Sequence, residues 1–353
     1  FPIAEVCDDG SAVITKQPGT GGIVTVGTVT AQLLYEIDQP AYANPDVVAR
    51  FDMIALTQEG PDRVRISGTR GEPAPRQLKV ALNSIGGWRN TMTMVITGLD
   101  IEAKAERAIA MLGEVLGGFD QFAEHFIELV RGDRPDAPSN SLATAHLRIT
   151  VKDPDRDKVD RRFSGAIMEL LLASYGGAFS ATPPTAATEF GIYRPAYVDA
   201  EQVRHVVTLP DGSDLVVAHP EPVAARAITV ETPPRRAVAG GPTQRVPLGR
   251  VCGARSGDKG GNANVGLWAR SDATYAWLRS ALTVDLFRAL LPEADELIVR
   301  RYELPNLRAL NFVVEGILGA GVASSVRFDA QAKGLGEYVR SRLVDIPTAV
   351  LNA

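Results

Sequence analysis

The feature that most constrains this chain is a stretch rich in proline and glycine that divides it into a longer and a shorter part. This stretch runs from Glu231 to Pro242. Prolines and glycines disfavour both helix and strand pairing, which is typical of a linker between domains. We therefore predict a linker over residues 231–245, one domain over 1–230 and a second over 246–353. A chain of 353 residues is long enough for two domains with a core each.

The longer part alternates strand-like runs with stretches that carry apolar residues at helical spacing. Strands are predicted at residues 11–16, 64–66, 78–82, 92–96 and 145–151, and helices at 25–37, 101–116, 119–129 and 159–171. We expect Asp100 to cap the second helix. Interleaving of this kind predicts a layered α/β core domain with some parallel strand pairing.

Three further segments of the longer part predict connections. Residues 84–90 indicate a glycine-bearing turn between two strands, with Trp88 and Arg89 on it, and Arg89 is a candidate anion-binding residue. Residues 176–195 indicate a long irregular loop, which in a compact domain is either functional or a contact surface. Asp211-Gly212 predicts the turn of a hairpin.

The shorter part has a more regular pattern. It predicts strands at residues 246–252, 265–269, 297–304 and 310–316, two helices capped by Ser271 and Thr283, and a last helix that begins at Asp329. The order of two strands, one or two helices, two strands and a helix indicates a small sheet with its helices on one side. We therefore predict a smaller ferredoxin-like α+β sandwich domain.

The most distinctive stretch is Arg255-Ser256-Gly257-Asp258-Lys259-Gly260-Gly261-Asn262-Ala263-Asn264, which we expect to be a loop between two strands. Glycines permit positive φ and close approach of a ligand, so such a loop can form an anion-binding concavity. Arg255 and Lys259 would supply charge, and Ser256, Gly260, Gly261, Asn262 and Asn264 would supply further donors. The alternative is a polar turn held by its own side chains, because turns favour the same residue types.

Two other segments could add donors. Lys16 precedes a turn with Gly19, Gly21 and Gly22 and then a helix, an order that places an anion at a helix N-terminus. This spacing is neither that of the P-loop nor the dinucleotide fingerprint, and a plain tight turn is the alternative. Between the last two strands lie Asn306, Arg308 and Asn311, which would converge with Arg255 and Lys259 if both connections lie at one end of the sheet.

Composition excludes several classes of protein. The net charge is −5 and no basic aromatic face is evident, which argues against a nucleic-acid partner. Cys7 and Cys252 have no second Cys or His at metal-ligand spacing, so we predict neither a metal site nor a disulfide framework. No apolar run is long enough to span a membrane and no signal peptide opens the chain, so we expect a cytoplasmic protein with no membrane partner.

The first residues suggest that the sequence is the later part of a longer protein. The chain opens with Phe1-Pro2-Ile3-Ala4, without an initiator Met, and a strand is expected there.

Four separated motifs resemble the acyclic terpene utilisation protein A (AtuA) family. They lie at residues 14–22, 86–93, 254–264 and 304–312, and the likeness covers essentially the whole chain. The resemblance implies an α/β core domain followed by a ferredoxin-like domain, and members usually carry a further N-terminal portion. The family takes its name from bacterial gene clusters that degrade citronellol- and geraniol-type terpenoids through CoA thioesters, beside acyl-CoA carboxylase and hydratase genes. The resemblance to this family does not identify any catalytic residues.

Two functions stay open. The first is a lyase or hydratase that acts on a CoA thioester or a branched hydroxy acid. Lys16, Arg255 and Lys259 would hold anionic groups, backbone N–H groups of the glycine pairs would stabilise an oxyanion, and Asp258 would be the general base. Nearby cations lower the pKa of a carboxyl and weaken it as a base, so the alternative role of Asp258 is a structural ion pair.

The second function is a non-catalytic scaffold or accessory subunit for acyl-CoA carboxylase or hydratase enzymes of the same pathway. The sequence shows no nucleophile, His and carboxylate set, no metal cluster and no cofactor fingerprint. We predict no cofactor, with CoA entering only as part of a substrate. A small anionic substrate, other enzymes of the acyl-CoA pathway and a second copy of the chain are the expected partners.

Overall fold

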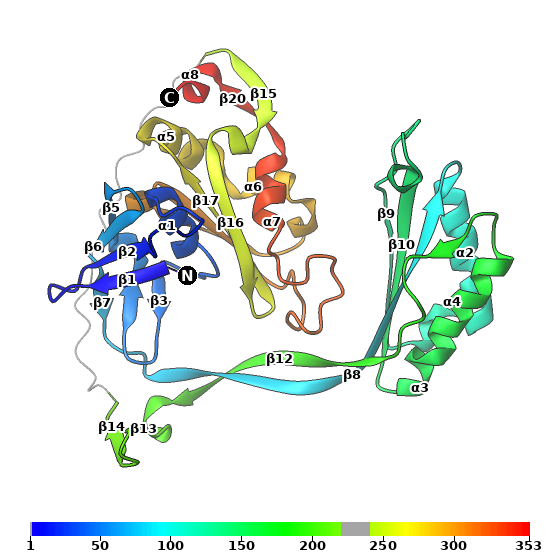
Figure 1. The fold of residues 1–353 in the computed structure, drawn as a ribbon, viewed down its shortest axis with the longest axis horizontal. Helices are drawn as coiled ribbons and strands as arrows, with labels where there is room; N and C mark the ends of the chain where they lie inside the picture. Colours follow the sequence, from blue (N-terminus) through cyan, green and yellow to red (C-terminus); the bar gives the residue numbers. More distant parts are fainter. Residues whose placement is uncertain (1, 220–240) are drawn as a thin grey trace. The chain divides into compact units, whose positions relative to one another are not determined.

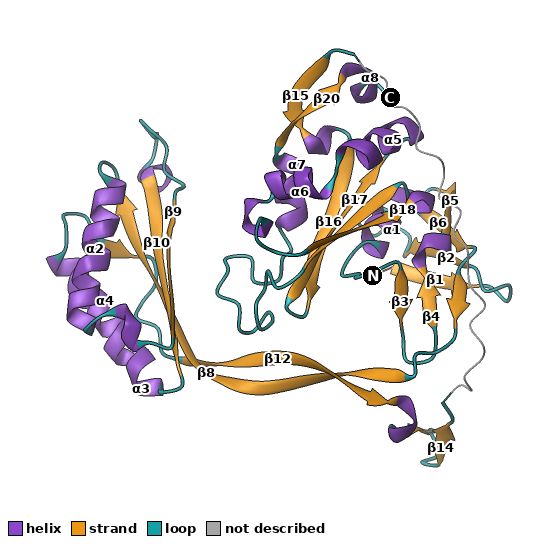
Figure 2. Cartoon of the chain, turned by 180° about the vertical axis from the view of Figure 1, so that it is seen from behind, coloured by secondary structure: helices purple, strands orange, loops and turns teal. Residues whose placement is uncertain are grey.

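The computed structural model describes residues 2–219 and 241–353 of the chain (Figure 1). The chain forms two compact units: unit 1 is Phe1–Leu82 with Tyr193–Ala353, and unit 2 is Asn83–Ile192. Helices and strands are mixed in both units, which confirms the mixed class (Figure 2). Unit 2 is inserted within residues 1–230, which the sequence predicted to form a single domain. Residues 231–240 of the predicted linker lie outside the described residues, so that boundary stays a prediction.

The N-terminal part of unit 1 forms two antiparallel sheets and the helix α1 (Val26–Leu33). One sheet has the order β1-β2-β6-β5 and the other β3-β4-β7. Their strands are β1 (Pro2–Val6), β2 (Ala12–Lys16), β3 (Ala41–Ala43), β4 (Val48–Arg50), β5 (Ala55–Gly60), β6 (Arg63–Ser67) and β7 (Arg70–Glu72). Val29 of α1 is buried against Val24 and Val64, because α1 turns one apolar face to the larger sheet.

The C-terminal part of unit 1 contains an antiparallel sheet of order β16-β17-β19-β18. Its elements are β16 (Cys252–Lys259), β17 (Asn262–Ala269), α5 (Asp272–Ala281), α6 (Val284–Leu290), β18 (Val299–Leu304), β19 (Ala309–Val314) and α7 (Leu335–Ser341). One sheet face packs on these helices through residues such as Phe312, whose ring stacks on Phe287 at 4.2 Å between centroids. Ser271 and Thr283 cap α5 and α6 as predicted.

The connections of this sheet are a rearranged form of the ferredoxin-like order. From β17 onward the chain follows the ferredoxin-like order through α5, α6, β18, β19 and α7. The strands β17, β18 and β19 correspond to the first three strands of that fold, and the helices occupy its two connections. The fourth place is occupied by β16, which precedes β17 in the chain. After α7 the chain instead forms β20 (Leu343–Pro347), which pairs with β15 (Thr243–Pro247), and ends in α8 (Thr348–Leu351).

Unit 2 contains a second ferredoxin-like sheet, which the sequence did not predict. Its strand order in the sheet is β11-β8-β10-β9. Along the chain, a helix connects the first strand to the second, and further helices connect the third strand to the fourth. The elements are β8 (Gln77–Thr97), α2 (Ile101–Leu116), β9 (Glu124–Val130), β10 (Thr144–Asp153), α3 (Arg156–Val159), α4 (Arg161–Ala173), β11 (Phe179–Ser180) and β12 (Thr188–Asp199), which pairs with β8. Figure 1 shows α2 and α4 along one face of this sheet.

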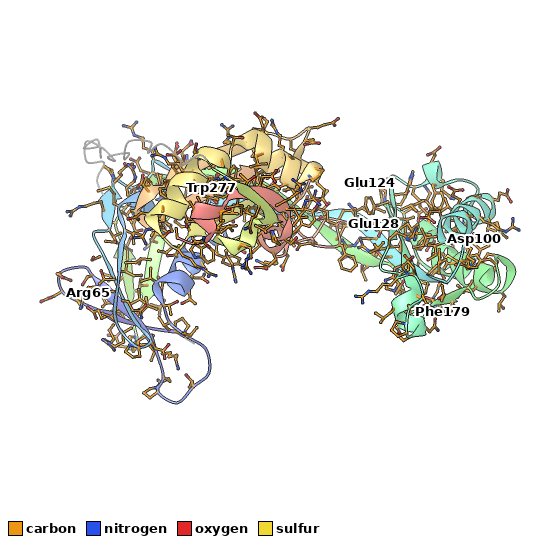
Figure 3. The ribbon with its side chains drawn as sticks, turned by 90° about the horizontal axis from the view of Figure 1, so that it is seen from above. Arg65, Asp100, Glu124, Glu128, Phe179 and Trp277 are labelled. Atoms are coloured by element: carbon orange, nitrogen blue, oxygen red, sulfur yellow. The ribbon has the colours of Figure 1, made fainter. Side chains whose placement is uncertain are left out.

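Several sequence expectations are corrected in unit 2. The helix predicted at 119–129 is a short 3-10 turn, η2 (Phe119–Gln121), followed by β9, since residues 124–130 pair along β10. The turn predicted at 84–90 is part of the continuous strand β8, and β12 takes up much of the loop predicted at 176–195. Asp100, labelled in Figure 3, is the N-cap residue of α2 as predicted, but its φ is 55° and its side chain makes no capping hydrogen bond within the described ranges.

Strand pairing differs from the predicted layered α/β arrangement. The pairs β1–β2, β8–β10 and β9–β10 are antiparallel, so the expected parallel pairing is wrong for these sheets. The predicted hairpin across Asp211-Gly212 is confirmed as β13 (His205–Thr208) with β14 (Asp214–Val217). The helix expected from Asp329 begins only at Leu335.

Candidate functional site

The stretch from Arg255 to Asn264 is a β-hairpin and not the predicted loop. β16 and β17 pair up to Lys259 and Asn262, which leaves only Gly260-Gly261 as the turn. Gly260 has a φ of +66°, and a Cβ there would lie 2.7 Å from the ring of Tyr193. The hairpin turn therefore requires glycine for both its backbone angle and its close contact.

One face of this hairpin holds the segment that follows α1. A Cβ on Gly257 would lie 2.6 Å from Glu36 Cγ, and a Cβ on Gly266 would lie 2.6 Å from Leu34 Cβ. These glycines are strand residues whose missing side chains make room for residues 34–36. Residues 34–36 therefore pack directly against the backbone of these two strands.

Two buried asparagines join the same segment to the sheet. Asn264 Nδ2 donates to Leu34 O at 2.7 Å and to Asn311 Oδ1 at 2.8 Å, while Asn264 Oδ1 accepts from Glu36 N–H at 2.9 Å. Asn311 Nδ2 donates to Asp38 O at 2.7 Å. Both side chains are fully buried, so these bonds satisfy backbone groups that water does not reach.

Ser256 and Asn262 also bond to the protein itself. Ser256 Oγ accepts from Gly336 N–H at 2.8 Å in the first turn of α7 and donates to Lys333 O at 3.1 Å. Asn262 Oδ1 accepts from Gly316 N–H at 2.9 Å. Ser256 thus caps a helix from a neighbouring strand.

A charged cluster lies at the exposed edge of β16, and we call Tyr35, Glu36, Asp258 and Lys333 the Lys333 cluster. Lys333 Nζ donates to the Tyr35 hydroxyl and to Glu36 Oε1, and it lies 3.5 Å from Asp258 Oδ1. Burial alone would lower the pKa of Lys333, but the bonds to Glu36 and Tyr35 raise it well above its ordinary value. Lys333 is therefore a fixed cation and not a nucleophile.

The same contacts act on Glu36. Partial burial would raise the pKa of its carboxyl, but the bonds from Lys333 and Tyr35 and the charges of Lys333 and Lys259 leave that pKa lowered. Glu36 is thus a carboxylate at neutral pH and a weak base.

Arg255 and Lys259 are the cations of this edge that form no ion pair in the described part of the chain. Arg255 Cζ lies 4.4 Å from the centroid of the Tyr35 ring, and Lys259 Nζ lies 5.0 Å from that of Tyr42. Within residues 2–219 and 241–353, neither forms an ion pair. They are four residues apart on one strand and share one of its faces, roughly 13 Å along it. Together they form a cationic edge lined by two tyrosines.

Asn306 and Arg308 do not converge with Lys259, which corrects that expectation. Trp268 pairs with Ala309, whereas Ala263, next to the hairpin turn, pairs with Val314. The turn η7 (Pro305–Leu307) therefore lies at the opposite end of the sheet, roughly 20 Å from Gly260-Gly261. There, Asn306 Nδ2 donates to Phe51 O and Ile54 O at 2.9 and 2.8 Å. Arg308 Nε donates to Asp272 Oδ1.

The turn that contains Gly19, Gly21 and Gly22 is closed by the protein itself. Lys16 Nζ donates to Thr20 O at 2.7 Å and pairs with Asp62 at 3.4 Å. Asp62 Oδ1 accepts from Val24 N–H at 2.7 Å, just before α1. Lys16 and the Asp62 carboxylate therefore fix the backbone of the turn that precedes α1.

Arg89, which was expected to bind an anion, lies on β8 in unit 2. Burial, and then the charge of Arg148, lower the pKa of Arg89. Strand alternation places both arginines on the sheet face opposite Met92 and Met94.

Sequence reasoning missed Tyr35, Glu36, Tyr42 and Lys333. No local pattern marks them, because Lys333 meets Tyr35 across 298 positions of sequence. Among the described residues, no group of three or more His, Cys, Asp or Glu side chains is arranged to hold a metal ion. None of the helices in those ranges is both long and apolar enough to cross a membrane.

Two family models match the chain. One, described as acyclic terpene utilisation family protein AtuA, matches residues 1–209, and the other, described as the AtuA ferredoxin-like domain, matches residues 246–345. No curated protein and no solved structure matches. The second matched range contains β16, β17 and the cationic edge.

Proposed function

The chain belongs to the acyclic terpene utilisation family AtuA, and on that premise we propose that it binds an anionic acyl intermediate of acyclic terpenoid breakdown. The proposed ligand is a CoA thioester or a branched hydroxy acid. The proposed reaction is a lyase or hydratase step on that ligand.

The observation that supports this proposal is the pair of cations on β16. Arg255 and Lys259 have tyrosine rings beside them and, in the described part of the chain, no carboxylate in ion-pair range. A cation stacked on an aromatic ring is held in place while its remaining N–H groups stay available. The spacing of roughly 13 Å suits two separate anionic groups of one extended ligand better than one small anion.

Acid–base chemistry at this edge would use Asp258 or Glu36. Asp258 lies 3.5 Å from Lys333, and the lowered pKa of Glu36 keeps that carboxyl ionised. Ionised carboxylates beside cations orient a ligand or stabilise positive charge better than they remove protons. In our proposal, therefore, Asp258 acts chiefly by positioning Lys333, and Lys259 is the residue that contacts the ligand.

The alternative function is a scaffold or accessory subunit for acyl-CoA carboxylase or hydratase enzymes. One observation favours it: Ser256, Asn264 and Asn311, which were expected to bind substrate, bond to other parts of unit 1. A protein that only presents surfaces to partner enzymes needs such bonds and no free donors.

Ligand titration of the whole chain separates the two proposals. We expect a CoA thioester or a free branched acid to raise the melting temperature by mass action, with less effect from chloride at equal ionic strength. Arg255→Ala with Lys259→Ala should abolish that shift and leave the unliganded melting temperature within a few degrees, because both side chains lie at an exposed edge.

A matched control is Arg250→Ala, which removes a cation that precedes the same strand. It should leave the ligand shift intact. No shift with any of these ligands, together with stable co-purification with a carboxylase or hydratase, would favour the scaffold. Equal loss of melting temperature and ligand shift in the double variant would show that the cations are structural.

A further inference from the structure

A second group of donors lies in unit 2, between α2 and the residues that follow α4. Lys104 Nζ donates to Thr97 O at 3.0 Å and lies 6.0 Å from the centroid of the Tyr175 ring. Arg107 Nε donates to Ser174 O at 3.2 Å. Lys104 and Arg107 are three residues apart on α2, so their side chains leave the helix on one side. Both cations therefore reach the segment 174–175.

The two residues of that segment carry buried hydroxyls without partners. Ser174 is 9% exposed, and neither Ser174 Oγ nor Tyr175 Oη has a hydrogen-bond partner among residues 2–219 and 241–353. Burial raises the pKa of Tyr175, so its O–H stays protonated and able to donate. A buried hydroxyl without a partner is unfavourable, and two of them at consecutive residues indicate that something polar completes their bonding.

The hydroxyl of Thr97 is also buried and has no partner in the described part of the chain, but it does not belong to this group. Met94 and Ile96 of β8 belong to the core beneath the helices. Side chains alternate along a strand, so the Thr97 side chain points to the other face of the sheet.

Lys104 and Arg107 give this group an excess of positive charge. In the ranges 2–219 and 241–353, Lys104 and Arg107 form no ion pair, and the acceptors of their hydrogen bonds are backbone carbonyls. Two cations and two hydroxyl donors with no carboxylate suit an oxyanion of double negative charge better than a carboxylate. We propose that Lys104, Arg107, Ser174 and Tyr175 form a binding site for a phosphate group.

This site is independent of the proposed function, since it lies in unit 2 and shares no residue with the cationic edge of β16. Unit 2 offers a matched control in Arg162 of α4. Arg162 Nη2 donates to Leu116 O at 3.4 Å, so it also bonds a helix-end carbonyl. The buried hydroxyl without a partner that lies near it in sequence, Ser164 Oγ, is two residues further along α4 and therefore leaves the helix on another side.

The test is a titration of the whole chain with inorganic phosphate, followed by calorimetry or NMR at constant ionic strength, with acetate and chloride as comparison anions. We expect phosphate to bind more tightly than acetate and chloride to show no saturable binding. Lys104→Ala with Arg107→Ala should weaken phosphate binding by at least about tenfold. Tyr175→Phe should weaken it less, and Arg162→Ala should leave it within about twofold of the unmodified chain.

Circular dichroism of each variant shows whether it is folded, and Tyr175→Phe, which removes one oxygen, keeps the test valid if the double variant fails to fold. A second readout is the alkaline titration of Tyr175, which bound phosphate should shift to higher pH because a dianion disfavours the phenolate. No saturable phosphate binding, or equal losses in Arg162→Ala and Tyr175→Phe, would overturn the site. Ordered water alone would then satisfy the two hydroxyls.

Discussion

The two ferredoxin-like sheets share a strand order but differ in the face that turns away from their helices. In unit 1 that face carries Gly257, Gly266, Asn264 and Asn311, and the segment after α1 lies directly on it. In unit 2 the strands β8 from residue 88 onward, β9 and β10 contain no glycine. Their corresponding face carries threonines and charged side chains, including Glu124 and Glu128 of β9, both labelled in Figure 3.

The comparison teaches what glycine and asparagine mean within a strand. Glycine lets another backbone approach to van der Waals distance, and a buried amide can both donate to a carbonyl and accept from an N–H. Together, the glycines and asparagines hold the segment after α1 on the sheet. The backbone groups of that segment are not paired within a helix or strand, so the asparagine side chains supply their hydrogen bonds. Without them, a sheet face keeps its side chains and no such segment can approach so closely.

The largest effect is expected from Asn264→Ala. This change leaves Leu34 O and Glu36 N–H buried without partners and removes the bond to Asn311. We expect the free energy of unfolding to fall by about 3–5 kcal/mol, measured by chemical denaturation.

The matched change in the other sheet is Thr91→Ala, which removes a 2.9 Å hydroxyl contact to Thr150. It should cost about 1 kcal/mol, because each threonine hydroxyl has few partners to lose. Equal costs for the two changes would mean that the faces do not differ in the way described.

Gly266→Ala should have the next largest effect. The added methyl group would lie 2.6 Å from Leu34 Cβ, and Leu34 is fully buried, so either the segment or the strand must shift. We expect a loss of about 2–3 kcal/mol in unfolding free energy. Gly165→Ala on α4, where a Cβ meets nothing within 4 Å, is the control and should be neutral or stabilising.

Ser256→Ala tests the other side of β16. It removes the acceptor for Gly336 N–H at the start of α7, and this site is buried. The expected loss is about 1–2 kcal/mol, with faster hydrogen exchange in the first turn of α7. Unchanged exchange there would show that the helix begins without this cap.

The smallest effect is expected from Lys333→Met, because the Lys333 cluster is partly exposed. The loss should be below about 1 kcal/mol at neutral pH. The folded-state pKa of Glu36 is lowered from 4.5, so its pairing stabilises the fold above that pH and is lost as the pH falls through the folded-state pKa. The difference between Lys333→Met and the unmodified chain should therefore shrink in acid, whereas Lys333→Arg should stay close to the unmodified chain throughout.

The sequence predicted the elements whose signals are local. The caps at Ser271 and Thr283, the hairpin at Asp211-Gly212 and the helix over 101–116 all depend on residues within a few positions of one another. The ferredoxin-like domain was expected at the C-terminus, and the matched family domain agrees.

What failed depends on contacts that are distant in the sequence. Gly257 was interpreted as a loop residue because the segment that lies on it is more than 200 positions away, as in the bond from Glu36 to Asn264. Residues 124–130 carry apolar positions that also fit a helix, and only pairing with β10 makes them a strand. The lack of an ion pair for Arg255 and Lys259 within the described residues could not be predicted either, since it depends on which carboxylates lie near them.

The central claim is that the polar motif of β16 and β17 holds the segment after α1 on the sheet and leaves Arg255 and Lys259 at its edge. Native-state hydrogen exchange of the Glu36 amide tests it most directly, because that N–H donates to Asn264 Oδ1. We predict slow exchange in the unmodified chain and an opening free energy lower by about 2–3 kcal/mol in Asn264→Ala. Fast exchange of this amide in the unmodified chain, or the same protection in both proteins, would contradict the account.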